Sequence, residues 1–237
     1  MGRRAIIYIG PSLSLRKAQQ VFPEADYRPP AKKGDLLRLA AELGNSVNGS
    51  AADVGIGLVD AVFLQDYPPT PIEVYQLVRK SNVIVAGAAS LGALRAVELE
   101  RFGMVGIGKI FQLYKSEKIH ADDEVAVTFT DVEYKLESEA MVDIRYNLFL
   151  AKKRGAINNQ ARTALARTAK KIYFPHRNYL HIIEEAARAY PSLASEFEAF
   201  ANYIKSKRKS LKEMDALKLV KSMRKFVETG ELAQMQK

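Results

Sequence analysis

The first half of the chain alternates between two patterns of hydrophobic and polar residues. Short β-branched runs closed by Gly, Pro or Asp are typical of buried strands, and apolar positions three and four residues apart are typical of helices. Strands that alternate with helices of about ten residues indicate βαβ units. We therefore predict an α/β fold: a mainly parallel sheet with flanking helices and a Rossmann-like core. The predicted strands cover residues 5–9, 25–28, 54–65 and 83–86, with a short unit at 105–114 and strand character at 125–129.

Residues typical of helix starts lie between these predicted strands. Ser12 or Ser14 would cap the first helix, and Asp35 would cap a helix over residues 36–43. Thr70 followed by Pro71 and Glu73 fits a capping box with proline at the first helical position. The Gly- and Pro-rich loops then follow the carboxyl ends of the strands, where parallel sheets bind ligands.

The second half reads as helical from about residue 136. Apolar spacing predicts helices over 161–173, 179–189, 193–206 and 211–229. We predict two domains, an α/β core over residues 1–135 and an all-helical C-terminal region over residues 136–237.

Charge separates the two halves. Residues 1–150 carry 17 Lys and Arg against 19 Asp and Glu, whereas residues 151–237 carry 19 against 8. A basic tail suits an acidic protein surface or nucleic acid, and a solvated helical face is the plain alternative.

Composition limits the chemistry. The chain has no cysteine, which excludes disulfides, thiolate metal sites and a cysteine nucleophile. The apolar run at residues 5–9 is too short for a signal peptide, and no stretch approaches the roughly 18 apolar residues of a membrane span. We expect a cytoplasmic protein with no membrane association.

Residues 88–92 (AASLG) carry the first candidate chemistry. They approach the G-x-S-x-G pattern, in which small residues let a strand turn sharply into a helix and expose a serine nucleophile. The amides of Leu91 and Gly92 would then donate to a developing oxyanion. The alternative is that Ser90 only caps the helix over residues 91–99.

A serine nucleophile needs a base. His120 precedes an acidic cluster and is the histidine that fits the sheet edge, because His176 and His181 lie in the helical tail. A lysine with a lowered pKa is the other option, and Lys32 and Lys109 lie in loops predicted to reach the same edge. Each lysine also fits a solvated surface residue.

Other charged residues have weaker signals. Asp122, Asp123 and Glu124 are potential Mg²⁺ ligands, but no phosphate cradle accompanies them. Arg95 would pair with a carboxylate of a substrate or bridge to Asp35 or Glu98. The chain has no G-x-G-x-x-G turn and no G-x-x-x-x-G-K-[ST] motif, so we expect no nucleotide cofactor and no metal.

Within residues 6–130 the chain resembles the TfuA-like family. The resemblance lies in ordered blocks, of which GAASLGALRAVEL is the longest; the archaeal members, with short spacing and Lys-rich loops, are the more similar. The blocks are GPSL (10–13), PPAKKGDL (29–36), VDAVFLQ (59–65), GAASLGALRAVEL (87–99), FGMVGIGKIF (102–111) and DDEVAV (122–127).

The resemblance implies an activity. TfuA proteins accompany YcaO enzymes in peptide backbone thioamidation, in archaea on a glycine of methyl-coenzyme M reductase. They are thought to release sulfide from a thiocarboxylated ThiS-like sulfur carrier at a serine–lysine site. The motif match makes Ser90 the nucleophile, with Lys32 as first and Lys109 as second choice of base.

The implied partners are a YcaO enzyme, the sulfur carrier and a peptide or protein substrate. Leu91, Gly92, Arg95 and Asp35 are the expected substrate contacts. Many bacterial members read His-Lys-Glu where this chain reads Pro71-Ile72-Glu73, so no lysine base is available there. Two alternatives remain: a non-catalytic adaptor that tethers carrier and substrate to YcaO, and, with less support, nucleic-acid binding through Lys205, Lys207, Arg208 and Lys209.

Overall fold

The computed structural model describes residues 2–44, 53–62 and 66–232. Its contacts divide the chain into an α/β unit, residues 1–122 and 212–237, and a helical unit, residues 123–211. The sequence analysis placed the boundary at residue 136 and assigned everything after it to one helical region. The difference lies mainly in the last helix, which packs on the sheet.

The α/β unit is built on one five-stranded sheet, in which every strand pair is parallel and the order is β2-β1-β3-β4-β5. The predicted parallel α/β class is confirmed. The predicted strand over residues 54–65 is shorter than expected, because regular pairing ends at Leu58, and residues 63–65 lie outside the described part of the chain. The strands are β1 (Arg4–Tyr8), β2 (Asp26–Arg28), β3 (Val54–Leu58), β4 (Val83–Ala88) and β5 (Val105–Ile107).

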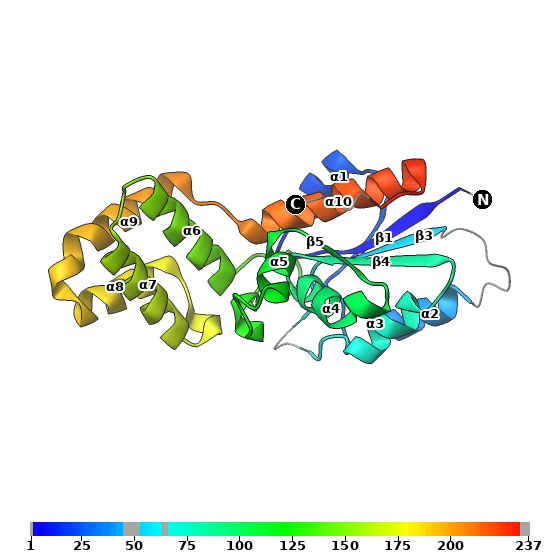
Figure 1. The fold of residues 1–237 in the computed structure, drawn as a ribbon, viewed down its shortest axis with the longest axis horizontal. Helices are drawn as coiled ribbons and strands as arrows, with labels where there is room; N and C mark the ends of the chain where they lie inside the picture. The colour runs from blue at the N-terminus through cyan, green and yellow to red at the C-terminus, as the bar shows by residue number, and fades with distance from the viewer. Residues whose placement is uncertain (1, 45–52, 63–65, 233–237) are drawn as a thin grey trace. The chain divides into compact units, whose positions relative to one another are not determined.

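Helices cover both faces of the sheet. Helices α1 (Leu15–Val21) and α10 (Leu211–Thr229) lie on one face, and α2 (Asp35–Glu42), α3 (Pro71–Val78) and α4 (Leu91–Leu99) lie on the other (Figure 1). A short 3-10 helix, η1 (Glu100–Phe102), leads from α4 towards β5, and α5 (Lys109–Lys115) follows β5 and contacts α4.

Most predicted helix caps are present. The Ser14 hydroxyl accepts the Lys17 amide, and Thr70 and Glu73 form both halves of the capping box. The prediction that Asp35 caps α2 is wrong. The cap is Gly34, whose φ of 90° suits glycine, and the Asp35 carboxylate accepts the Lys32 amide at 2.7 Å from inside the helix.

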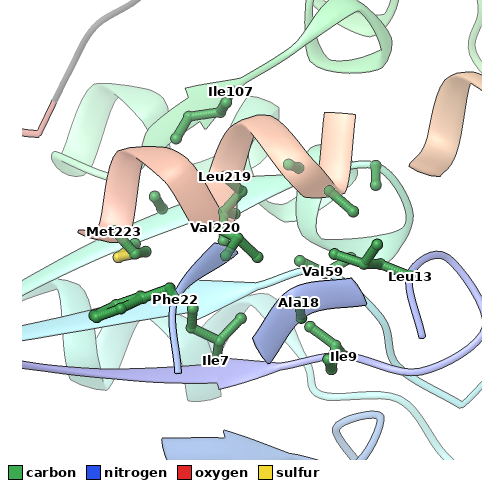
Figure 2. Packing of buried hydrophobic residues seen from close by; sticks show 14 of the residues in the cluster. Ile7, Ile9, Leu13, Ala18, Phe22, Val59, Ile107, Leu219, Val220 and Met223 are labelled. Carbon is green, nitrogen blue, oxygen red and sulfur yellow. The ribbon is translucent and has the colours of Figure 1, made fainter. Parts of the chain in front are cut away.

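The core of the α/β unit lies between the sheet and α10. Leu219, Val220 and Met223 of α10 pack with Ile7 and Val59 (Figure 2). Two strand glycines make room for this helix. A Cβ atom on Gly55 would lie 2.8 Å from the Phe226 ring, and one on Gly57 would lie 2.6 Å from Leu219.

The helical unit has a core of its own. The helices predicted over residues 161–173, 179–189 and 193–206 are confirmed here, and a further helix, α6, precedes them. The helix predicted over residues 211–229 is also present, as α10 of the α/β unit. Phe197 and Phe200 are fully buried there with Leu148 and Leu165. Its helices are α6 (Met141–Lys153), α7 (Asn159–Lys171), α8 (Tyr179–Ala189) and α9 (Ala194–Lys207), with 3-10 turns η3 (Phe174–His176) and η4 (Pro191–Leu193).

The predicted strand character at residues 125–129 is wrong. Among the described residues this segment has no strand to pair with, and only an isolated antiparallel bridge joins Phe129 to Leu136. A 3-10 turn, η2 (Asp122–Glu124), comes just before it. Across the described ranges, every helix is too short or too polar for a membrane span.

Candidate active site

The turn at Ser90 joins β4 to α4. Its amide donates to the Ala88 carbonyl oxygen at 2.8 Å, and Ala89 between them has a φ of 63°. This bond from residue i+2 to residue i forms a γ-turn of the strained hand. A non-glycine residue held at positive φ costs about 1–3 kcal/mol and persists only where the surroundings impose it. The turn therefore marks a candidate functional position.

Two glycines impose the turn. A Cβ atom on Gly87 would lie 2.0 Å from the Gly92 carbonyl oxygen, and one on Gly92 would lie 1.8 Å from the Leu58 carbonyl oxygen. Only glycine allows main chain to approach main chain this closely. The run of small residues read from the sequence thus seats the first turn of α4 directly on the ends of β3 and β4.

Ser90 occupies the N-cap position of α4 without acting as a side-chain cap. It is 2% exposed, and its hydroxyl accepts no bond from the helix amides. The simple capping explanation is therefore not observed, and the hydroxyl is left available at the carboxyl end of the sheet.

The two expected oxyanion donors differ. The Gly92 amide donates to the Val59 carbonyl oxygen at 3.3 Å, so it is already engaged. The Leu91 amide, at the first position of α4, has no backbone acceptor in the part of the chain that the structure describes. Leu91 is the better placed of the two to stabilise an anion, helped by the positive end of the helix dipole.

The loops that carry Lys32 and Lys109 also lie at the carboxyl edge of the sheet, where Ser90 follows β4. Lys32 follows Ala31, which bridges to Ala61 just beyond β3, and its ammonium lies 3.7 Å from the Asp66 carboxylate. On the other side, Ala88 of β4 is the register partner of Ile107 of β5, so Ser90 and Lys109 each lie two residues beyond a paired position. Within the described ranges, no hydrogen bond joins the Ser90 hydroxyl to either lysine.

Asp215 fixes the loop that carries Lys109, a role that the sequence analysis missed. Its fully buried carboxylate accepts the amides of Ile110, at 2.7 Å, and Lys109. Burial raises the pKa of Asp215, although these bonds and the Lys218 ammonium at 3.3 Å oppose the shift. A Cβ atom on Gly108 would lie 2.3 Å from the carboxyl carbon, so the carboxylate sits directly against the turn.

Arg95 and Asp35 have structural partners. The buried Arg95 guanidinium donates to the Pro69 carbonyl oxygen at 3.0 Å and to both Glu98 carboxylate oxygens at 2.9 and 2.8 Å. The predicted bridge to Glu98 is therefore present. Asp35 instead pairs with Arg38 on its own helix.

Asp60 is a second residue that the sequence analysis missed. It follows β3 at the point where the strand order reverses between β1 and β3, and it is 1% exposed. Its carboxylate accepts the amides of Gly10 and Ser12 at 2.9 and 3.0 Å, and the Ser12 hydroxyl at 2.5 Å. In other parallel α/β folds, main-chain amides of the loop after the first strand bind phosphate groups. Here the Gly10 and Ser12 amides of that loop already donate to Asp60. The sequence signal that could have identified Asp60 is an acidic residue within an otherwise apolar run.

The histidines and the acidic cluster face solvent or contact other groups of the chain. His120 and His176 are exposed, and the His181 ring contacts the His176 carbonyl oxygen. Basic side chains hold the carboxylates of Asp123 and Glu124. No cluster of His, Asp and Glu suited to a metal ion occurs among the described residues.

A family model described as TfuA-like protein matches residues 60–178, half of the chain. The chain belongs to the TfuA-like family. The matched range contains Ser90 and Lys109, begins after Lys32 and Asp35, and reaches into the helical unit, beyond the blocks recognised in the sequence. The family is associated with YcaO-dependent thioamidation. A search of curated proteins found no match.

Proposed function

We propose that this TfuA-like protein supports YcaO-dependent thioamidation by releasing sulfide from the thiocarboxylated C-terminus of a ThiS-like carrier. The observation that carries the proposal is the Ser90 turn, with its positive φ at Ala89 and a hydroxyl that does not cap the helix. Because Ser90 is 2% exposed, a slender extended chain end fits the site better than a bulky substrate. A glycine of methyl-coenzyme M reductase is the proposed target of the pathway.

The proposed chemistry has two steps. The Ser90 oxygen attacks the thiocarboxylate carbon, a carbon–oxygen bond forms, the carbon–sulfur bond breaks, and the serine proton leaves with sulfur as hydrosulfide. Water then cleaves the acyl ester, which restores Ser90 and releases a carrier carboxylate and a proton. The Leu91 amide is the proposed donor to the oxyanion.

Two observations favour Lys109 over Lys32 as the base that moves the serine proton. The Lys32 ammonium already faces Asp66, whereas Lys109 has no acidic partner among the described residues. Lys109 also lies inside the region matched by the family model, and Lys32 lies outside it. We expect Lys109→Met to lower the rate of sulfide release and Lys32→Met to change it little.

The proposal is tested by sulfide release from a thiocarboxylated carrier. We expect Ser90→Ala to abolish release, and Ser14→Ala, which alters the exposed cap of α1, to keep the wild-type rate. A Ser90→Ala rate equal to that of the wild type would remove Ser90 as the nucleophile.

A surface patch favours a second candidate function, an adaptor that binds YcaO. Ile72 is 70% exposed and Phe102 is 47% exposed, and the Phe102 ring lies 5.2 Å from that of Tyr75. Neighbouring exposed apolar side chains mark protein-binding surfaces. We expect the double variant Ile72→Asp with Phe102→Ser to weaken YcaO capture, and the control Val132→Asp, at a side chain that is 89% exposed, to leave it unchanged. If both variants retain capture, the patch is not the docking surface.

A further inference from the structure

A stretch of the helical unit carries only positive charge. Residues 144–183 contain nine Lys and Arg and no Asp or Glu. They include most of α6 and all of α7, which contact each other. Such a concentration of one charge on packed helices attracts anions.

A cavity of about 440 Å³ lies against these two helices. Four cationic side chains line it, Arg145 from α6 and Arg162, Arg167 and Lys170 from α7, together with the Thr163 hydroxyl. We call this group the basic cavity. Leu148 and Ala166 supply its apolar wall.

Acidic residues hold two of these cations in place. Glu124 is 3% exposed, and its carboxylate accepts hydrogen bonds from Nε and Nη2 of Arg145, both at 2.9 Å. The Lys170 ammonium donates to Glu124 at 3.0 Å and also to Asp123, which in turn binds the buried Arg177. A charged group held by a buried partner is positioned before any ligand arrives.

The other two cations have no such partner. Within the described residues, neither the Arg162 nor the Arg167 side chain forms an ion pair or hydrogen bond. The Nε atom of Arg162 is buried and has no acceptor. Buried donors are normally satisfied, so this atom points to a missing acceptor in the cavity.

The balance of charge indicates the class of ligand. The four lining cations and Arg177, which lies outside the lining and pairs with Asp123, contribute five positive charges. The carboxylates of Asp123 and Glu124 remove two of these charges, which leaves three. A single carboxylate would leave most of this charge uncompensated. A diphosphate group carries about three negative charges at neutral pH, and its tetrahedral oxygens match the fork of a guanidinium.

We propose that the basic cavity binds the diphosphate group of a small molecule. An adjoining cavity of about 380 Å³ shares Thr163 and Arg167 with it and is lined by Asn159, Gln160 and Tyr190. Side-chain amides and an aromatic ring suit an attached ring system such as a nucleoside. The site lies in the helical unit, whereas Ser90 belongs to the α/β unit.

Calorimetric titration of the full-length protein with inorganic pyrophosphate tests the proposal. We expect binding in the wild type at low salt, and at least a tenfold weaker affinity in the double variant Arg162→Gln with Arg167→Gln. The matched control Lys152→Gln with Lys153→Gln removes two exposed charges from the end of α6 and should change affinity less than threefold. Because Arg167 is exposed, Arg167→Gln alone keeps the test valid if the double variant misfolds.

Titration with other ligands shows whether the bound anion is a free diphosphate or part of a nucleotide. Tighter binding of ADP than of pyrophosphate supports a nucleotide, and equal binding supports the diphosphate group alone. The proposal is overturned if pyrophosphate does not bind, if citrate binds as tightly as pyrophosphate, or if the cavity variant and the control lose affinity equally. Binding of a single-stranded RNA in preference to both small molecules would also overturn it, in favour of a nucleic-acid surface.

Discussion

A Cβ atom on Gly92 would lie 1.8 Å from the carbonyl oxygen of Leu58. The first turn of α4 therefore rests on the main chain of β3 with no space for a side chain. The Gly92 amide adds a hydrogen bond to Val59 at 3.3 Å. These contacts fix where α4 begins, and with it the position of Ser90.

Replacing Gly92 should disturb both stability and the site. Gly92→Ala forces the helix away from β3, and overpacking of this kind costs about 1–3 kcal/mol in the free energy of unfolding. We expect urea denaturation to show that loss, accompanied by loss of sulfide release. Gly2→Ala is the control, because nothing lies within 4 Å of its added Cβ atom. Equal stability of Gly92→Ala and the wild type would contradict the observed packing.

Removing the Asp60 carboxylate should have a larger effect than removing an exposed acid. Asp60→Ala leaves two buried amides and the Ser12 hydroxyl without their acceptor, which should cost about 3 kcal/mol or more. Asp26→Ala breaks a surface pair with Arg28 and should cost below about 1 kcal/mol. Thermal and urea unfolding of the two variants measure the difference. Similar losses in both would mean that Asp60 does not hold the loop after β1.

The raised pKa of Asp215 predicts a pH-dependent stability. The folded protein binds this proton more tightly than the unfolded chain, so its contribution is fully present below pH 3.8 and is lost as pH rises through the raised value. Relative to Asp215→Asn, which keeps an acceptor oxygen, the wild type should therefore lose stability as pH increases over that range. Urea denaturation of both proteins from pH 3 to 7 measures the difference. A difference that stays constant, or that grows in favour of the wild type, would contradict the assignment.

Local patterns were enough to predict much of the fold. Alternating strand and helix signals gave the parallel sheet, and short-range capping chemistry identified Ser14 and the Thr70–Glu73 box. The same local pattern located the turn at Ser90, since small residues between a strand and a helix have few other uses.

What the sequence did not reveal depends on distant partners. Asp215 holds the turn before α5 from more than 100 residues away, and Asp60 binds a loop 50 residues earlier. Helix α10 packs on the sheet over the glycines of β3. The spacing of those glycines in the sequence does not indicate which helix covers them. The cap at Gly34 was missed because its positive φ is set by the preceding loop rather than by a side chain.

The most direct test of the proposed mechanism is detection of the acyl-enzyme. Wild-type protein mixed with a thiocarboxylated carrier and quenched in acid is analysed by intact-mass and peptide mass spectrometry. The mechanism predicts an ester between the carrier C-terminus and Ser90, formed with loss of hydrosulfide and absent in Ser90→Ala. An ester on another residue, or the same conjugate in Ser90→Ala, would contradict it.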